Sequence, residues 1–466
     1  MYKQQIEEYF SKHKKELLED IGKLIAVQSD RSEAKPGMPF GKGPAKALEL
    51  ALNIAKEKGL ITKNYENYVG TVDVNDKETE LGILAHLDVV PAGTGWTTNP
   101  YEMVEKSGKI YGRGTADDKG PAVAALYALK AVKDLNIPLS KNVRLILGTD
   151  EECGSNDIAY YFSKEKVPPK TFSPDGEYPV INIEKGSFRS SFTGRYQKNE
   201  SLPRIISING GLKQNMVPKL CEAVIEGFTL LEVEDYIKPV AKQLKVKYEL
   251  LESNQEVHIT IEGNSAHGST PELGNNPITA MLTILSGMSF AKSEGFNRIC
   301  SVNKLYPHGD FYGEALGINM SDDESGKLTI GLNIFEYNEE SLKGSFDCRS
   351  PLCANDDNVV SVMEMNMIRE GLFLEIEKMN PPHYVDKNSE LVQNLLKVYE
   401  DYTGKEGQCL AIGGGTYVHH IEGGVCFGCS MPGTDNHMHS SDEFAVIDEL
   451  MLSAKMFTQI IIDICA

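Results

Sequence analysis

The chain lacks an excess of positive charge and any long apolar run. Its 466 residues include 67 acidic and 47 basic side chains, which gives a formal net charge of −20 at pH 7. This balance disfavours nucleic acids and anionic membranes as partners, because both attract basic surfaces. No segment reaches the ~18 apolar residues of a membrane span, and the polar N-terminal segment lacks the apolar stretch of a signal peptide. We therefore expect a cytoplasmic protein.

A paired cysteine framework is also missing. The nine cysteines are scattered and odd in number, which argues against a disulfide scaffold. Cys426 and Cys429 form a CxxC pair, but a zinc knuckle needs a second such pair, or histidines in the right order. We interpret the cysteines as reduced and mostly buried thiols. Low-complexity segments and short repeats are absent as well.

The chain is long enough for two or three domains. Over residues 1–184 strand and helix patterns alternate, for example a nearly continuous apolar strand at 81–87, a helix at 118–134 and a strand at 143–147. This alternation predicts an α/β fold with a mostly parallel sheet and functional residues at the carboxyl ends of its strands.

The pattern changes from about residue 186. Alternating strand patterns such as residues 188–193 and 256–262 indicate an antiparallel α+β region. From about residue 383 helix, strand and loop return, and the chain closes with an amphipathic helix at 445–462. We predict one α/β domain in two parts, residues 1–184 and 383–466, interrupted by an inserted α+β domain of residues 185–382.

Acidic and imidazole side chains follow the predicted strands of the α/β domain. His86 and Asp88, two residues apart on extended chain, project to the same side, so one can bind a metal while the other orients it. Glu151 and Glu152 are adjacent and point in opposite directions, so one can bind a metal while the other transfers a proton. Taken singly, each pair is explained as well by solvated loop residues on an acidic chain.

Five candidates together would suit a pair of metal ions. They are His86, Asp117, Glu152, Asp175 and His439. Carboxylates mixed with imidazoles suit zinc or manganese better than magnesium or calcium. A co-catalytic pair ~3.5–4 Å apart needs about five ligands including one bridge, and this set leaves Glu151 free as a base. Individually, Asp175 could simply form an Asp-Gly turn, and His439 could lie in a polar surface loop.

Four segments carry a family resemblance: AHLDVVPAG, GRGTADDKGP, GTDEECGS and SPDGEYP. With a late His-x-x-Asp-Glu at residues 439–443, they resemble the di-zinc metallopeptidase family of aminoacylase, carnosinase, peptidase T and carboxypeptidase G. The resemblance is closest to the PepV-type dipeptidases and extends over essentially the whole chain. It implies a mostly parallel-sheet di-zinc catalytic domain interrupted by an inserted lid domain.

The resemblance also implies roles for the candidate ligands. His86 and Asp175 would hold one of two Zn²⁺ ions, which Mn²⁺ or Co²⁺ could replace. Glu152 and His439 would hold the other, and Asp117 would bridge them. A neighbouring cis peptide would join Asp117 to Asp118, Asp88 would steady His86, and Glu151 would be the general base. His439 fits the family spacing, whereas His437 does not.

Residues of the inserted domain resemble the family's lid residues. His267 (NSAHGSTPELGNNP) would polarise the scissile carbonyl, Arg349 (DCRSP) would bind a C-terminal carboxylate, and Asn215 (QNMVPKL) would assist. Gly415, in the GGGT run of residues 413–416, would offer a backbone N–H to the substrate carboxylate. Apart from the resemblance, these residues are explained more simply by structural roles.

The segment after the GGGT run departs from the family pattern. Val418 and His419 stand where an arginine is expected. This departure leaves the substrate preference open, but not the chemistry.

The function implied by the resemblance is a metal-dependent dipeptidase, cytoplasmic and monomeric, without nucleic-acid or membrane partners. It would hydrolyse unblocked dipeptides, of broad or Xaa-His/β-Ala type, with a water activated by two zinc ions and Glu151. Two alternatives stay open. One is an N-acyl-amino-acid deacylase or carboxypeptidase of the same family. The other is a non-catalytic peptide-binding member, which the presence of Glu151 and all five ligands disfavours.

Overall fold

The structure is a computed structural model that describes residues 2–466. The chain forms two compact units. Unit 1 consists of Met1–Glu184, His383–Leu410 and Gly415–Ala466, and unit 2 consists of Lys185–Pro382 and Ala411–Gly414. Within residues 2–466, no helix is both long and apolar enough to cross a membrane.

Unit 1 is built on a mixed sheet whose centre is parallel. Strands β6, β3, β7 and β24 run parallel to one another, as expected from the alternating sequence pattern. Antiparallel strands flank them on both sides. In spatial order the strands are β1 (Ile61–Tyr65), β2 (Val69–Asp73), β6 (Asn142–Gly148), β3 (Thr79–His86), β7 (Lys170–Ser173), β24 (Val425–Cys426), β9 (Val180–Glu184) and β22 (His383–Tyr384).

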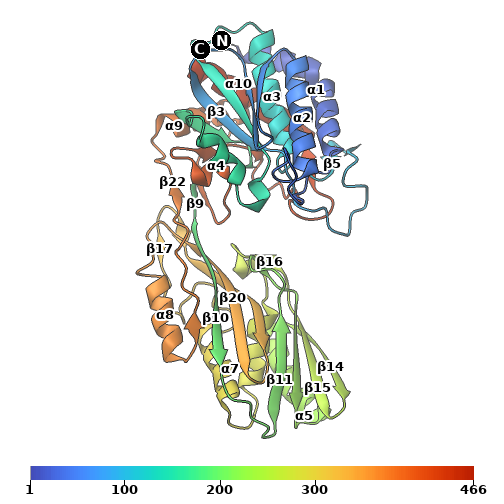
Figure 1. Cartoon of the computed structure of the whole chain (residues 1–466), viewed down its shortest axis with the longest axis vertical. Helices are drawn as coiled ribbons and strands as arrows, with labels where there is room; N and C mark the ends of the chain where they lie inside the picture. Colours follow the sequence, from blue (N-terminus) through green and yellow to red (C-terminus); the bar gives the residue numbers. More distant parts are fainter. Residues whose placement is uncertain (1) are drawn as a thin grey trace. The chain divides into compact units, whose positions relative to one another are not determined.

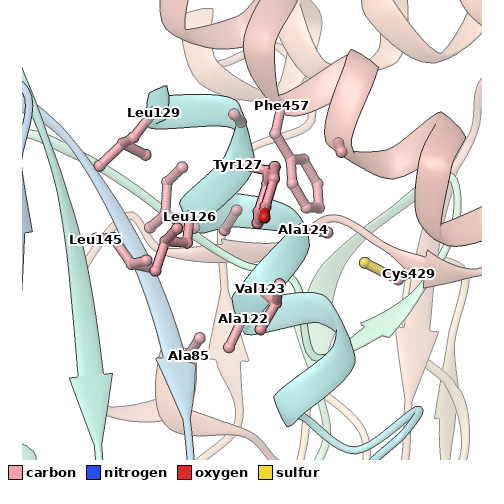
Figure 2. Close-up of a cluster of buried hydrophobic side chains, with 14 of the residues drawn as sticks. Ala85, Ala122, Val123, Ala124, Leu126, Tyr127, Leu129, Leu145, Cys429 and Phe457 are labelled. Carbon is pink, nitrogen blue, oxygen red and sulfur yellow. The ribbon is translucent and has the colours of Figure 1, made fainter. Parts of the chain in front are cut away.

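Helices cover this sheet (Figure 1). The helices of unit 1 are α1 (Lys3–Ile25), α2 (Lys42–Glu57), α3 (Lys119–Asp134), α4 (Asn156–Phe162), α9 (Glu390–Thr403) and α10 (Ile447–Cys465), with short 3₁₀ turns η1 (Glu151–Cys153) and η3 (Tyr417–His420). Helix α3 is buried almost all round, because it packs against β3 and β6 on one side and α1 and α10 on others. Figure 2 shows side chains of α3 between Ala85 of β3, Leu145 of β6 and Phe457 of α10. Such a helix is held in place on all sides. The loop of residues 112–118, which precedes it, is buried as well.

Short strands complete unit 1. The strands β4 (Val104–Lys106), β5 (Lys109–Tyr111) and β26 (Phe444–Val446) form a separate three-stranded sheet in the order β26-β5-β4. The strands β8 (Gly176–Glu177) and β25 (Cys429–Ser430) pair in parallel, and β23 (Cys409–Ile412) pairs with β9. All nine cysteines are free thiols, and the CxxC pair is buried.

Unit 2 contains an eight-stranded sheet that is antiparallel throughout. Its spatial order is β14 (Lys247–Ser253), β15 (Glu256–Glu262), β13 (Leu220–Glu226), β11 (Arg204–Gly210), β19 (Thr329–Tyr337), β20 (Ser341–Ser350), β10 (Gly186–Arg195) and β21 (Phe373–Leu374). The remaining elements are α5 (Leu230–Leu244), α6 (Pro277–Ser286), α7 (Glu294–Leu305), α8 (Val360–Arg369), η2 (Pro271–Leu273) and the short strands β12 (Met216–Val217), β16 (Ala266–His267), β17 (Ser321–Asp322) and β18 (Gly326–Lys327).

The two faces of the unit 2 sheet differ in polarity. Alternate residues of each strand point to opposite faces, and one face packs its apolar side chains against α5 and α6. On β20, Phe346 and Cys348 belong to this core, whereas Asp347 and Arg349 alternate with them. The second face therefore carries buried charge, which needs partners.

Candidate metal centre

The carboxyl ends of three neighbouring strands deliver most of the candidate ligands. Strand β3 ends at His86, the turn with Glu151 and Glu152 follows β6, and Asp175 follows β7. Because β6, β3 and β7 are adjacent and parallel, these side chains meet at one edge of the sheet. The prediction that all ligands follow strands of this sheet is wrong for Asp117, which follows β5 of the separate three-stranded sheet.

Pairing between two distant segments brings His439 to the same place. Strand β26 pairs with β5, with Phe444 opposite Tyr111, so the loop before β26 lies beside the loop after β5. The first loop carries His439 and the second carries Asp117. His437 lies elsewhere, with its ring against Phe444, and takes no part in the cluster.

Asp117 lies between two imidazoles. Its Oδ1 is 3.0 Å from Nε2 of His86, and its Oδ2 is 3.0 Å from Nε2 of His439. The side chain is largely buried, and the peptide bond to Asp118 is cis. A carboxylate that offers one oxygen to each of two imidazole nitrogens has the arrangement of a bridging ligand.

The ring of His86 is oriented by the backbone. Its Nδ1 lies 3.0 Å from the carbonyl oxygen of Asp88, to which it can donate. The lone pair then lies on Nε2, which is buried and makes no hydrogen bond with the residues that the structure describes. That nitrogen is also 3.6 Å from Oδ2 of Asp175. An imidazole held by one nitrogen, with the other facing carboxylates, is typical of a metal ligand.

Two overlapping groups of ligand atoms surround His86. The ligand atoms of His86, Glu151 and Asp175 all lie within 4.8 Å of one another, and so do those of His86, Asp117 and Glu152. Oε2 of Glu152 is also 3.3 Å from Nε2 of His439, while its buried Oε1 has no hydrogen-bond partner among residues 2–466. Apart from the exposed His439, the donor set is therefore crowded, largely buried and partly unsatisfied.

The electrostatics of this cluster favour a bound cation. Burial and the neighbouring carboxylates raise the pKa of Glu151 well above its usual value. Burial and the charge of Asp117 raise the pKa of Glu152 to about 7. Burial acts in the same direction on Asp117, but the neighbouring imidazoles of His439 and His86 outweigh it and lower the pKa of that carboxyl. Divalent cations would relieve the repulsion among these carboxylates, so the residues present fit metal ions.

Asp88 positions the two glutamates. Its Oδ1 accepts the backbone N–H of Glu151 at 3.2 Å, and its Oδ2 accepts that of Glu152 at 3.1 Å. The two glutamates form one turn of 3₁₀ helix, so the prediction of an extended pair with opposed side chains is wrong. Asp88 thus holds two parts of the site in place. Its backbone carbonyl accepts from the ring of His86, and its carboxylate accepts from the turn that carries Glu151 and Glu152.

Glu443 is a buried residue to which the sequence analysis assigns no role. There it is only the last residue of the His-x-x-Asp-Glu motif at residues 439–443. Its carboxylate accepts the backbone N–H groups of Gly114, Ala116 and Asp117 at 2.9 to 3.2 Å and pairs with Arg113 at 2.5 Å. It therefore holds the loop that presents the bridging carboxylate. The sequence gives no sign of these contacts, because the partners are more than 320 residues apart.

The three predicted lid residues lie close together within unit 2. Strand β12 pairs with β16, with Met216 opposite His267, and the carbonyl of Asn215 accepts the N–H of Gly268 at 2.8 Å. A Cβ on Gly268 would lie 2.5 Å from Oδ2 of Asp347, so glycine permits this close approach. The ring Nδ1 of His267 is 2.6 Å from the Ser269 hydroxyl.

Arg349 is held by its neighbour on the same strand. Its Nε and one terminal nitrogen each donate to an oxygen of Asp347 at 2.9 Å, and its other terminal nitrogen donates to the carbonyl of Gly413. Both side chains are buried. Since three of the five guanidinium N–H groups are used in these bonds, two donors are left over.

Gly415 belongs to unit 1, where a buried carboxylate supports the segment that follows it. Glu184 accepts from the N–H and hydroxyl of Thr416 at 3.0 and 2.8 Å, and its other oxygen is 3.0 Å from the His419 ring. Val418 is fully buried. His419, one of the two residues that stand where the family pattern has an arginine, is therefore a partner of Glu184.

Comparison with known proteins identifies relatives over the full length. The model of the family described as peptidase family M20/M25/M40 matches residues 82–463. The "Beta-Ala-Xaa dipeptidase" of Lactobacillus delbrueckii subsp. lactis is 35% identical over 458 residues, which cover 96% of each chain.

Solved structures share the fold at low sequence identity. Human carnosine dipeptidase 1 has a TM-score of 0.61 and 15% identity, with 100% of this chain and 99% of that chain covered. The di-peptidase Dug1p from Saccharomyces cerevisiae has a TM-score of 0.57 and 14% identity, with 99% and 98% covered.

Proposed function

The chain belongs to peptidase family M20/M25/M40, and from this premise we propose that it hydrolyses unblocked dipeptides with two bound zinc ions. The observation that carries the proposal is Asp117, whose two oxygens each lie 3.0 Å from the Nε2 of a different histidine. The chain is a metallopeptidase by family, and the name of the Lactobacillus relative supports dipeptides, β-alanyl ones included, as substrates.

Each ligand has a proposed place. His86 and Asp175 would hold one ion, Glu152 and His439 would hold the other, and Asp117 would be shared between them. The mixture of carboxylates and imidazoles supports zinc, with Mn²⁺ or Co²⁺ able to replace it. When bound, the metal ions lower the pKa of the attacking water and polarise the scissile carbonyl.

Glu151 is the proposed general base. Its carboxylate takes a proton from the attacking water and delivers it to the leaving amine nitrogen, so one group acts as base and then as acid. Burial raises the pKa of Glu151 well above its usual value, which suits a group that first takes up a proton and then returns it. Asp88 keeps Glu151 in place through the backbone N–H of the turn.

Four residues are proposed to bind the substrate. His267 donates to the developing oxyanion, Arg349 binds the C-terminal carboxylate, and Asn215 assists. Gly415 adds a backbone N–H. We further propose that the enzyme is a monomer in the cytoplasm, where its free thiols stay reduced.

The test is hydrolysis by metal-defined protein. Protein stripped by a chelator should be inactive and should regain activity with Zn²⁺, Mn²⁺ or Co²⁺. The Glu151→Gln variant should lose about 10²- to 10⁴-fold in kcat while keeping its metal content. Full activity of Glu151→Gln, or of exhaustively stripped protein, would contradict the proposal.

A second candidate within the family is an N-acyl-amino-acid deacylase or carboxypeptidase. The choice depends on whether the amino group of the substrate is free. Alanyl-alanine and N-acetyl-alanyl-alanine, assayed side by side, separate the candidates. Faster hydrolysis of the unblocked dipeptide is the expected result, and preference for the acetylated one would favour the second candidate.

A further inference from the structure

One face of strands β10 and β20 carries a cluster of three charged residues. The antiparallel register places Arg189 opposite Asp347 and Ser187 opposite Arg349. Residues opposite each other in such a pair share a face of the sheet. Arg189, Asp347 and Arg349 therefore lie on the same face, opposite the apolar core that contains Phe346.

Both arginines bind the same carboxylate oxygen. Nε of Arg349 and Nε of Arg189 donate to Oδ1 of Asp347 at 2.9 and 3.2 Å. Among the ion pairs of residues 2–466, neither arginine has a second carboxylate partner. The cluster thus carries two positive charges and one negative charge, a net charge of +1.

This excess charge depends on Arg189. Arg349 and Asp347 alone make a bidentate, buried pair without net charge, and a second carboxylate that approached it would meet the negative charge already there. Arg189 supplies the unbalanced positive charge. Its side chain is 43% exposed, and its terminal nitrogens donate to no described residue, so they remain able to bind a ligand.

We infer that Arg189 is a specificity-determining residue that selects substrates with a free α-carboxylate, by giving the Arg189–Asp347–Arg349 cluster its net positive charge. The inference rests on the proposed peptidase function and adds a second guanidinium to the proposed carboxylate site. Asp347 is then the positioning residue, since its Oδ1 accepts from the Nε of both arginines. A positive cluster with unused N–H donors suits a carboxylate, because guanidinium and carboxylate match in charge and planar geometry.

The test compares alanyl-alanine with its C-terminal amide, using the metal-loaded full chain. Arg189→Gln should raise the KM for alanyl-alanine roughly tenfold, the size of one partly exposed charge-assisted hydrogen bond, and leave kcat within about twofold. Arg189→Lys should recover part of the loss, because it keeps the charge. For the amide, wild type and Arg189→Gln should have equal KM values, since no carboxylate is present.

Arg195→Gln is the matched control. Arg195 lies exposed on the same strand, six residues further along, so its loss changes the net charge of the protein equally without touching the cluster. An unchanged KM for alanyl-alanine in Arg189→Gln would overturn the inference. Equal losses for the acid and the amide would also overturn it, because they would indicate a structural role.

A binding measurement shows whether the inference about Arg189 or the proposed dipeptidase function fails. In the Glu151→Gln background, calorimetry with alanyl-alanine should show about tenfold weaker binding when Arg189→Gln is added. If the wild type hydrolyses no dipeptide but this difference is found, the proposed function fails and the inference stands. If the wild type hydrolyses dipeptides and Arg189→Gln binds equally well, the inference fails and the function stands.

Discussion

The candidate metal-binding carboxylates of unit 1 and the buried carboxylate Asp347 of unit 2 are compensated in opposite ways. In unit 1, Asp117, Glu152 and Asp175 gather around His86 with no lysine or arginine paired to them among the described residues. In unit 2, the fully buried Asp347 has two arginines. Burying charge is costly unless it is balanced, so the first cluster needs added cations and the second has positive charge to spare for an anion.

This difference separates two tasks of a peptidase. A cluster that lacks positive charge is suited to metal ions, and a cluster with a surplus is suited to a substrate carboxylate. Each of the two clusters therefore has an incomplete charge balance, which its proposed ligand completes. Three substitutions test whether the two clusters differ in this way.

The largest effect is expected from Asp117→Asn. Loss of the proposed bridge removes one negative charge and one shared oxygen, so both metal affinity and activity should fall. Activity should drop at least ~10³-fold, because several kcal/mol of metal-derived stabilisation are lost. Metal content by plasma mass spectrometry and dipeptide hydrolysis measure the two effects. Asp435→Asn, at an exposed acid of the same region, is the control, and a normal metal content in Asp117→Asn would contradict the bridging role.

A smaller effect, on stability as much as on binding, is expected from Asp347→Asn. The variant leaves two arginines close together without their shared counter-charge. Removing one partner of a buried ion pair costs roughly 3 kcal/mol, so the free energy of unfolding by denaturant should fall by about that amount. The exposed Asp323 of the same unit supplies the control variant Asp323→Asn. If Asp347→Asn were as stable as its control, the arginines would not depend on the carboxylate.

The smallest effect is expected from His308→Gln, which tests acid sensitivity in unit 2 without metal ions. Burial lowers the pKa of His308 below its usual value of 6.5, and its Nδ1 is 2.9 Å from the Thr279 hydroxyl. As the pH falls, His308 is therefore protonated in the unfolded chain before it is protonated in the folded chain. Its contribution to the free energy of unfolding is fully present above pH 6.5 and is lost as the pH drops through the folded pKa.

Thermal unfolding of chelator-treated protein at pH 7.5 and 5.5 measures this loss. The drop in melting temperature between the two pH values should be smaller in His308→Gln than in the wild type. His258→Gln, at a more exposed histidine of unit 2, should behave like the wild type. An equal drop in all three proteins would show that His308 does not contribute.

The elements of the site that sequence reasoning found are those with local signals. The apolar run at residues 81–87 predicts a buried strand, and β3 spans Thr79–His86. Strong helical periodicity predicts a helix from residue 118, and α3 begins at Lys119. The parallel sheet centre follows from the same alternation of strand and helix.

What sequence reasoning missed depends on contacts between distant segments. The three-residue strands β4, β5 and β26 are too short to give a periodic pattern, although they bring Asp117 and His439 together. Two further contacts depend on strand register. Glu443 binds the loop that carries Asp117, and Arg189 lies opposite Asp347. Register is set by packing across the whole sheet, so no local pattern reveals it.

The most direct test of the central claim is anomalous X-ray diffraction from crystals grown with zinc and measured on both sides of the zinc edge. If two ions share Asp117, two peaks should appear ~3.5–4 Å apart, with one oxygen of Asp117 at each and with His86 and His439 on different ions. A single ion, or two ions that do not share Asp117, would contradict it.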